Sequence, residues 1–230
     1  MKEILFNSLF FGFILSLLFY MFGIFLKKKL KLAIFNPLLI AVVLSIIFLI
    51  IFKIDYEIYN EGAKYLSYLL TPATVCFAIP LYKQLQILKK NALAIFTGIF
   101  AGVISSLGSI LLLSMAFGLT NQEYVTLLPK SITMAIGVDV AEEFGGIAAI
   151  TAASILITGI VGNVIAERTC KIFKITDSIA KGIAIGSSSH VIGTSKALEM
   201  GEIEGAVSSL SIVVSGIITV IAASLFAGLI

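Results

Sequence analysis

The sequence predicts an all-α protein, a polytopic transmembrane helical bundle with about seven or eight membrane segments, some broken or re-entrant. Hydrophobic residues make up 59% of the chain and charged residues 13%, with a mean hydropathy of +1.11, far outside the range of soluble domains. Apolar runs long enough to cross a bilayer, about 20 residues each, follow one another along the chain. Some runs are interrupted by proline, glycine or serine, which predicts irregular backbone shielded by protein or lining a cavity.

The chain is expected to form one transmembrane domain over residues 1–230, with two N-terminal helices in residues 1–60 and a broken-helix core in residues 61–230. The first helix is expected at Ile4 to Leu26. Its basic residues follow the apolar run instead of preceding it, so we expect a retained helix and not a cleaved signal peptide.

A tight basic loop follows the first helix and predicts a cytoplasmic turn, because cytoplasmic loops carry an excess of lysine and arginine. Its members are Lys27, Lys28, Lys29 and Lys31. The chain then returns outward over Leu32 to Phe52. A second basic cluster, Lys83, Lys89 and Lys90, is again expected inside. Ala63 to Leu81 must therefore cross between them, although Thr71-Pro72 interrupts it.

Ala92 to Leu119 reads as a long spanning helix rich in small residues that permit close packing. Leu127 to Val140 is short and contains proline, so it either crosses fully or re-enters. A full crossing would place the basic loop at Glu167 to Lys181 outside, against the positive-inside rule, and a re-entrant segment would place it inside. We favour the re-entrant interpretation.

Three segments complete the chain. Ile147 to Ile165 is a plain spanning helix, and Glu204 to Ile230 is the final span. Between them, Ile179 to Leu198 is short and interrupted by glycine, and the sequence leaves open whether it crosses or re-enters.

Two broken segments share a pattern that indicates an internal repeat. "LLTPATVCFA" from Leu69 and "TLLPKSITMA" from Thr126 both read Pro, any residue, Ser or Thr, three residues, Ala. Proline suits the first turn of a helix and threonine caps one, so half-helices are expected at Thr71-Pro72 and Leu128-Pro129, with a third at the Ser187 to Ser189 run.

Half-helix N-termini inside a membrane present unpaired N–H groups and a positive dipole end, which suit an anion. Transporters with broken helices use this device for carboxylates. A purely structural alternative stays open at each segment, because serine and threonine also link neighbouring membrane helices and prolines also make simple kinks.

Several ionisable residues lie in or beside the broken segments. Lys130 stands in an apolar run, where an ammonium should face a cavity, an acidic partner or a substrate carboxylate, unless it snorkels. His190, the only histidine, could donate to a substrate, carry a coupled proton, or be structural. Glu199 is expected to pair with Lys196 at helical spacing.

Candidate site residues follow from these segments. The substrate-binding candidates are Thr71, Thr74, Lys130, Ser131, Thr133, Ser188, Ser189, His190, Thr194 and Lys196. Candidates for ion or proton coupling are His190, Asp139, Glu142 and Glu199, whereas Glu143 is expected in a solvated turn.

Enzymatic functions find no support in the residue spacing. Gly186, Ser188 and His190 do not complete a G-x-S-x-G elbow, because histidine replaces the second glycine. The two cysteines, Cys76 and Cys170, lack metal-ligand spacing, so neither a disulfide framework nor a metal site is expected. We expect no cofactor and no nucleic-acid partner.

Four segments together resemble the signature segments of the LrgB/CidB family: "TPATVCFAIPLYKQ", "LLPKSIT", "EEFGGIAAIT" and "SSSHVIGTSKALEMGEIEGA". The resemblance covers the chain from Asn36 onward. It implies an antiholin-like membrane protein that modulates murein hydrolase activity and autolysis with an LrgA/CidA-type partner. It also implies carboxylate transport, because related proteins are associated with glycolate, glycerate or pyruvate.

The chain departs from the family pattern at four positions. Met134 and Ala135 stand where the pattern has Thr and Pro, Val191 stands where it has Gly, and Lys196 stands where it usually has Arg. A lysine offers a carboxylate a point charge instead of the bidentate fork of an arginine, so affinity or substrate choice could differ.

The sequence therefore favours a carrier of small monocarboxylates in a prokaryotic plasma membrane, with the coupling ion open and a homo-oligomer expected. The alternative is a regulator of murein hydrolases, which needs no convergent polar site at the midplane. A passive pore would require a continuous polar stripe along several helices, and none is evident.

Overall fold

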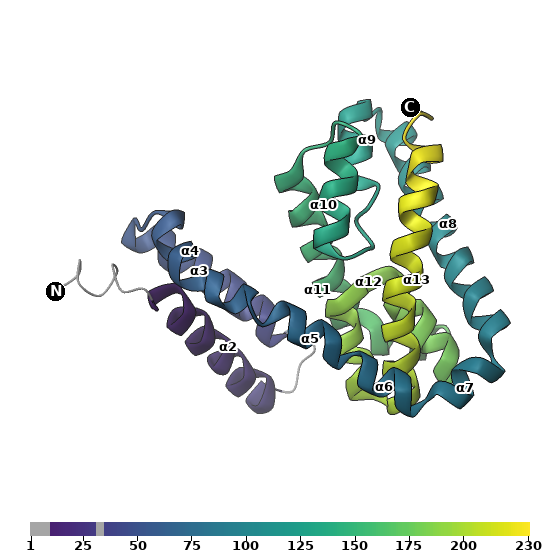
Figure 1. Cartoon of the computed structure of the whole chain (residues 1–230). Coiled ribbons are helices and arrows are strands. Elements are labelled where there is room, and N and C mark those ends of the chain that lie inside the picture. Colours follow the sequence, from purple (N-terminus) through teal and green to yellow (C-terminus); the bar gives the residue numbers. More distant parts are fainter. Residues whose placement is uncertain (1–9, 31–34) are drawn as a thin grey trace. The chain divides into compact units, whose positions relative to one another are not determined.

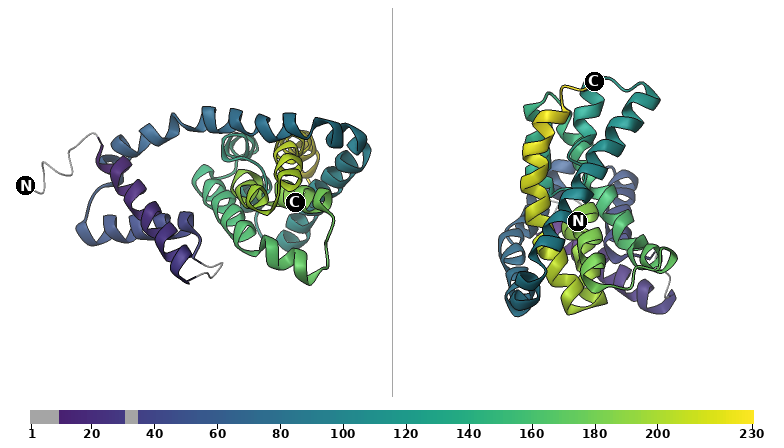
Figure 2. Two further views of the ribbon diagram at one scale, coloured as in Figure 1. Left: turned by 90° about the horizontal axis from the view of Figure 1, so that it is seen from below. Right: turned by 90° about the vertical axis from the view of Figure 1, so that its right-hand side faces the viewer.

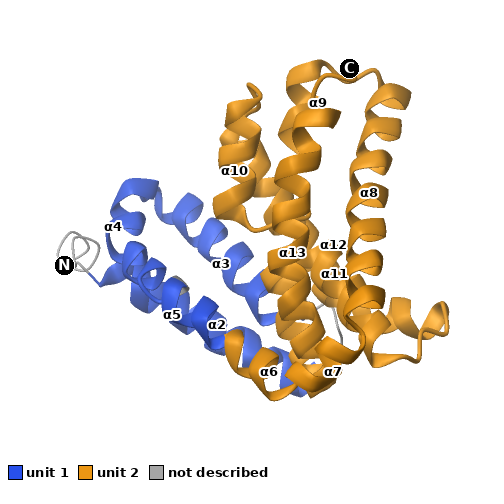
Figure 3. Cartoon of the chain, turned by 45° about the vertical axis from the view of Figure 1, so that its right-hand side comes forward, with its two compact units in different colours: residues 1–76 blue, residues 77–230 orange. Residues whose placement is uncertain are grey.

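A computed structural model describes residues 10–30 and 35–230, and these residues are helical with no strand among them (Figure 1). The chain divides into two compact units, residues 1–76 and 77–230 (Figure 3). The predicted helix start at Ile4, together with Lys31 and Leu32, lies outside the described residues.

The described part of unit 1 contains four helices. They are α2 (Phe11–Leu30), α3 (Pro37–Phe52), α4 (Tyr56–Ser67) and α5 (Leu70–Cys76). The start of α3 is fixed by Asn36, whose side chain accepts from the backbone N–H of Leu38, 2.8 Å away, with proline at the first helical position. Ser16 of α2 contacts the hydroxyl of Tyr59 in α4 at 2.7 Å, which joins these two helices.

The predicted helix break at Thr71-Pro72 is displaced in the structure. Helix α5 begins at Leu70, so Thr71 lies inside its first turn and is not the N-cap. Tyr68, the C-cap residue of α4, keeps right-handed helical angles, φ −66° and ψ −20°. Pro72 is tolerated there because the first turn of a helix needs no donor at that position.

Unit 2 holds the remaining helices. They are α6 (Ala78–Lys83), α7 (Leu85–Lys90), α8 (Ala92–Phe117), α9 (Asn121–Leu127), α10 (Met134–Glu143), α11 (Ala148–Ile172), α12 (Ser178–Met200) and α13 (Glu202–Phe226). We call the end of unit 2 with α7 and the start of α13 the basic end, and the opposite end, with the C-terminus, the C-terminal end (Figure 1). Figure 2, left, shows unit 2 nearly end-on, seen from the basic end.

Five helical stretches in the described residues are long and apolar enough to cross a membrane. They are Phe11–Leu30, Tyr56–Lys83, Ala92–Phe117, Ala148–Ile172 and Glu202–Phe226, with Pro37–Phe52 as a shorter apolar helix. The chain is therefore a multi-pass helical membrane protein, as predicted. The two segments that the sequence could not place, 127–140 and 179–198, are both hairpins.

The first hairpin, α9 and α10, enters unit 2 from the C-terminal end and returns to it. Asn121 at its start donates to the carbonyl of Ala227, 3.1 Å away, near the chain terminus. At its other end, the backbone N–H of Ile147 donates to Thr126 Oγ1 at 2.9 Å. Both ends of the segment thus lie together, and the predicted re-entrant course is confirmed. The basic loop that follows α11 consequently lies at the basic end.

The second hairpin is α12, which enters from the basic end and returns there. The helix turns back at His190, whose backbone has φ 42° and ψ −141°. Beyond the turn, a methyl group at Gly193 would lie 3.1 Å from the side chain of Ile185, so the two arms run side by side. Lys181 of the first arm lies 3.9 Å from Glu204, which closely follows the second arm. Residues 179–198 therefore re-enter and do not cross.

The two hairpins belong to an inverted repeat that the sequence analysis did not detect. Residues 92–147 form a span followed by a hairpin, α8 with α9 and α10. Residues 148–203 repeat this order with α11 and α12, each position lying 56 residues after its counterpart. Left-handed backbone follows both spans, at Gly118 (φ 66°) and at Lys174 (φ 54°). Because α8 and α11 run in opposite directions, the copies are inverted, as in many transporters.

The returning arms of the hairpins carry the clearest sequence similarity between the two copies. Seven positions match without a gap between residues 131–147 and 187–203, namely Ser131 and Ser187, Ile136 and Ile192, Gly137 and Gly193, Ala141 and Ala197, Glu143 and Glu199, Gly145 and Gly201, and Ile147 and Ile203. The repeat predicted from "LLTPATVCFA" and "TLLPKSITMA" differs from this one. Its first segment contains α5, and its second forms the turn between α9 and α10.

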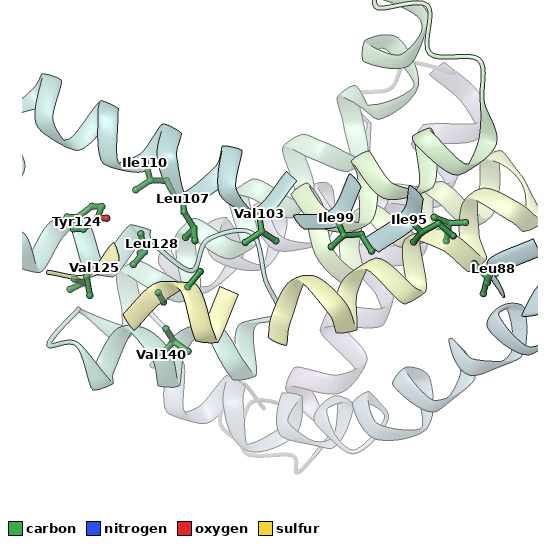
Figure 4. Packing of buried hydrophobic residues seen from close by; sticks show 14 residues of the cluster. Leu88, Ile95, Ile99, Val103, Leu107, Ile110, Tyr124, Val125, Leu128 and Val140 are labelled. Carbon is green, nitrogen blue, oxygen red and sulfur yellow. The ribbon is translucent and has the colours of Figure 1, made fainter. Parts of the chain in front are cut away.

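An apolar cluster extends through unit 2, from Leu88 of α7 at the basic end to Ala227 near the C-terminus. One face of α8, including Ile99, Val103 and Leu107, packs with Tyr124 and Leu128 of the first hairpin (Figure 4). All five side chains are at most 2% exposed. The hydroxyl of Tyr124 donates to the carbonyl of Phe226 at 3.0 Å, so the buried ring has its polar atom paired.

Candidate functional site

The two hairpin tips line one cavity in unit 2, which we call the tip cavity, of about 610 Å³. Its walls are Gly102, Ser105, Ser106 and Ser109 of α8, Lys130 and Ser131 of the first tip, Ile157, Thr158, Val161, Gly162, Ile165, Ala166, Thr169 and Cys170 of α11, Ile175, and Ala184, Ile185, Ser187, Ser188 and Ser189 of α12. This volume is in the range of small-molecule sites.

The cavity lies at mid-length of the two spans that flank it. Ser106 stands near the centre of α8 (Ala92–Phe117), and Gly162 stands near the centre of α11 (Ala148–Ile172). Irregular backbone reaches this depth only where protein surrounds it or where it lines a cavity. The two tips therefore meet the condition under which a membrane protein tolerates broken helices.

Lys130 supplies the charge of the tip cavity. The turn after α9 carries it, and its Nζ lies 3.3 Å from Ser131 Oγ. In the described part of the chain, no carboxylate lies within ion-pair distance of Nζ, and every other residue that lines the cavity is uncharged. An ammonium in such a place needs an anion or water as its partner.

Serine hydroxyls line the same cavity as this ammonium. Ser131 Oγ lies 2.9 Å from Ser106 Oγ, which fastens the first tip to the middle of α8. Ser188 donates to the carbonyl of Ala184 at 2.6 Å and also contacts Ser189 Oγ at 3.0 Å. Ser188 thus uses its hydroxyl hydrogen within its own helix, so the ammonium of Lys130 is the donor in this cavity that suits a small carboxylate.

His190 positions the second tip and does not line the cavity. Its side chain is 4% exposed, and its Nε2 donates to the backbone carbonyl of Ile155 in α11 at 2.9 Å. The positive φ of His190 is uncommon for a residue other than glycine, so the surrounding contacts must hold it. The candidate proton carrier is thus a buried residue at the bend of the hairpin.

Two glycines of α11 make room for the second tip. A methyl group at Gly159 would lie 2.6 Å from Cε1 of His190, and one at Gly162 would collide with Ser189 Oγ. Only glycine allows α12 to approach α11 this closely. These residues are part of the site, although they offer no functional group.

Two further candidates lie in the hairpins but outside the wall of either cavity. Thr194 is fully buried and binds the carbonyl of His190 at 2.9 Å and Ser208 Oγ at 2.7 Å, so it joins α12 to α13. Thr133 is the N-cap residue of α10, without a hydrogen bond from its side chain to the cap. The half-helix expected at Leu128-Pro129 therefore starts a few residues later than predicted.

Lys196 belongs to a second cavity, at the basic end, of about 890 Å³. We call it the basic cavity, and it is lined by Glu167, Cys170, Lys171, Lys174, Ile175, Thr176, Lys181, Lys196, Glu199, Met200 and Glu204. Lys196 Nζ lies 3.3 Å from Glu199 and 3.3 Å from Glu167. The predicted pair of Lys196 with Glu199 is confirmed.

The remaining acidic candidates lie away from both cavities. Asp139 and Glu142 are exposed on α10, and Glu143 is exposed at its end, where a solvated turn was expected. Thr71 and Thr74 are exposed on α5 and belong to unit 1. The structure therefore brings four of the ten predicted binding residues into the tip cavity, namely Lys130, Ser131, Ser188 and Ser189.

Sequence reasoning missed the contribution of the two spans. Ser105, Ser106 and Ser109 of α8 and Thr158 of α11 all line the tip cavity. The stretch "GVISSLGS" from Gly102 carries a visible signal, since serines three or four residues apart share one helical face. The prediction for this helix considered only the close packing that its small residues permit.

The geometry gives no support to a serine hydrolase or a metal centre. The Nε2 of His190 donates to a backbone carbonyl, and the hydroxyl of Ser188 donates within its own helix. The two side chains therefore do not form a pair of nucleophile and base. In residues 10–30 and 35–230, no group of three or more metal-binding side chains gathers.

Comparison with known proteins gives a consistent result over most of the chain. Residues 16–229 match the LrgB-like family. Relatives named "Antiholin-like protein LrgB" in Bacillus mycoides (strain KBAB4), Bacillus cereus (strain B4264) and Bacillus anthracis (strain CDC 684 / NRRL 3495) are 37% identical over 218 residues, covering 94% of this chain and 95% of each relative. No solved structure matches.

Proposed function

The chain belongs to the LrgB-like family, and from this premise and the tip cavity we propose that it transports small organic anions across the bacterial plasma membrane. The substrates we expect are monocarboxylates of the size of pyruvate, glycolate or glycerate. The coupling ion is left open.

The observation that carries this proposal is the ammonium of Lys130 in the tip cavity, with no described carboxylate beside it. Charged side chains at this depth are costly, and they usually serve a substrate or ion pathway. A site with one cation and several hydroxyls selects a small monoanion with further polar oxygens. Nothing in this set favours a cation.

The inverted repeat supports transport independently of the charge. Repeats of opposite orientation, with broken elements meeting near the middle of the spans, are common in secondary transporters. They allow access to one site to alternate between the two sides. A scaffold has no physical need for paired re-entrant tips around a polar cavity.

A second candidate function rests on the names of the relatives, which favour it over transport. Those proteins are called antiholin-like. In this second function the chain would regulate murein hydrolases and autolysis together with an LrgA/CidA-type membrane subunit. We expect a homo-oligomer in either case.

Uptake into proteoliposomes tests the transport proposal. The purified full-length chain is reconstituted, and labelled pyruvate, glycolate and lactate are offered with and without a pH gradient. We expect uptake of at least one of them above that of liposomes without protein. Absence of uptake of all three under both conditions contradicts the proposal.

The two functions are separated by a variant that keeps the fold and loses the charge. Lys130→Met is expected to abolish uptake in proteoliposomes. If autolysis in cells then remains under the control of the variant protein, regulation does not depend on transport. If control is lost together with uptake, the transported anion mediates the regulation.

A further inference from the structure

The basic cavity adjoins the tip cavity. Cys170 and Ile175 line both of them, so these two side chains form the boundary between the cavities. A second cavity, lined by lysines, thus lies between the tip cavity and the basic end of unit 2. This arrangement suggests a route for a charged solute.

The charges of the basic cavity are unevenly balanced. Four lysines face three glutamates, and Lys171, Lys181 and Lys196 each form an ion pair with a glutamate. Lys174 has no carboxylate within ion-pair distance in the part of the chain that the structure describes. A cleft lined by one excess sign of charge raises the local concentration of ions of the opposite sign.

The inverted repeat allows the residues of the basic cavity to be compared with their counterparts at the C-terminal end of unit 2. The positions that correspond to Cys170, Lys181 and Lys196 of the basic cavity are Ser114, Val125 and Val140. These three side chains are 1%, 1% and 5% exposed, and the two valines belong to the apolar cluster of unit 2. The places of Lys181 and Lys196 are therefore charged and line a cavity at the basic end, whereas their counterparts Val125 and Val140 are packed and apolar at the other end.

We propose that the basic cavity is an electrostatic vestibule through which small organic anions reach the tip cavity from the basic end, and that the C-terminal end is sealed in this conformation. The proposal rests on the proposed function for the nature of the anion. It assigns Lys174 and Lys181 to attraction of the anion and Cys170 to the passage between the cavities. By the positive-inside rule, the vestibule faces the cytoplasm.

The cysteine content of the chain allows a direct test. The sequence has two cysteines, so Cys76→Ser leaves Cys170 as the sole thiol of the full-length protein. Membrane vesicles of both orientations are treated with an anionic methanethiosulfonate reagent (2-sulfonatoethyl) or a cationic one (2-trimethylammonioethyl). Rates are normalised to those of a small free thiol with the same reagents.

We expect Cys170 to react in inverted vesicles and not in right-side-out vesicles, with the anionic reagent favoured about tenfold, the lower end of the usual focusing effect. The double variant Lys174→Gln, Lys181→Gln leaves two lysines against three glutamates in the cavity, so the ratio of the anionic to the cationic rate should fall to one or below. Lys89→Gln serves as the matched control, since Lys89 is exposed on α7 and lines neither cavity. This control should leave the ratio unchanged.

A second probe covers the case that Cys170 is too buried to react. Ile175→Cys, in a background with Cys76→Ser and Cys170→Ser, places a thiol at the other residue shared by the cavities. Reaction from the C-terminal side only, no reaction at either position, or a rate ratio that ignores the two lysines overturns the proposal. If labelling behaves as expected in a protein that transports no carboxylate, the vestibule stands and the proposed transport function fails.

Discussion

Lys130 is the residue on which the chemistry of the site depends. It follows Pro129 in the turn between α9 and α10, and its ammonium reaches the tip cavity beside Ser131. A snorkelling lysine would extend its charge to the membrane surface. At mid-length of the flanking spans, the ammonium instead has hydroxyl groups as its neighbours.

Removal of this charge should weaken carboxylate binding. We expect Lys130→Met to lower the affinity by about 1.5 to 3 kcal/mol, the range for a hydrogen bond to a charged group. Lys130→Arg should keep part of the affinity, because the charge remains while the geometry changes. Equilibrium binding of pyruvate, glycolate and lactate to purified protein measures this effect. Wild-type affinity in Lys130→Met would show that the lysine does not contact the substrate.

His190 should act through the position of the second tip. Its Nε2 donates to the carbonyl of Ile155, and its backbone has a positive φ. Asparagine retains an N–H donor for the carbonyl of Ile155, whereas leucine does not. We therefore expect His190→Leu to lose about 1 to 3 kcal/mol of stability and His190→Asn to lose less. Unfolding of both variants in the same detergent gives the comparison, and equal stability would contradict this role.

At the scale of single residues, the sequence predicted which polar residues belong to the hairpin tips better than it predicted where each side chain points. Lys130, Ser131, Ser188 and Ser189 reach the cavity as expected. His190 stands in the same serine-rich stretch, but the bend of the backbone turns its ring to Ile155. Sequence spacing alone cannot show this, because it assumes that a helix continues through the residue.

The elements of the site are two hairpins that were partly predictable. The re-entrant course of residues 127–140 followed from the charge of the later basic loop and is confirmed. The break in α12 lies at His190, just after the predicted Ser187 to Ser189 run, because helical hydrogen bonding carries on through the serines. The prediction that Thr71 caps a half-helix was wrong, because α5 already begins at Leu70. A proline is also tolerated inside the first turn of a helix, so it does not mark the start by itself.

The packing of α12 on α11 gives a test at the scale of elements. A methyl group at Gly159 would lie 2.6 Å from the imidazole of His190, so Gly159→Ala must displace the second tip. Gly108→Ala in α8 is the matched control, because nothing lies within 4 Å of its added methyl group. We expect Gly159→Ala to lose most carboxylate uptake and Gly108→Ala to retain it, in proteoliposomes with equal amounts of inserted protein. Full uptake by Gly159→Ala would show that the tip need not lie against α11.

At the scale of the whole molecule, the inverted repeat explains why hydropathy alone misjudges the topology. Two apolar segments, 121–147 and 178–200, each enter and leave at the same end, so counting each as one span would invert the basic loop that lies between them. The copies were hidden because the similarity is concentrated in the returning arms. In the two spans the matching positions are few, because one face of each span packs on different neighbours.

The repeat predicts the sidedness of four loops. Single cysteines at Thr120 and Glu143 should react with an impermeant maleimide from the outside, and those at Thr176 and Glu202 from the inside, all in a background without native cysteines; the four native side chains are exposed. The reason is that each hairpin returns to the end at which it enters. A pair of loops that flank one hairpin but react from opposite sides would show that the hairpin crosses the membrane.

The central claim is that one anion site lies between the two hairpin tips. Ser131→Cys and Ser188→Cys, each in a background with Cys76→Ser and Cys170→Ser, place a single thiol on either side of the tip cavity. The direct measurement is the rate of alkylation of each thiol by N-ethylmaleimide at rising concentrations of pyruvate, glycolate or lactate. The account predicts that the same carboxylate protects both thiols with the same half-protecting concentration, and that adding Lys130→Met raises that concentration for both. Protection of neither thiol by any of the three carboxylates, or of one thiol only, would contradict it.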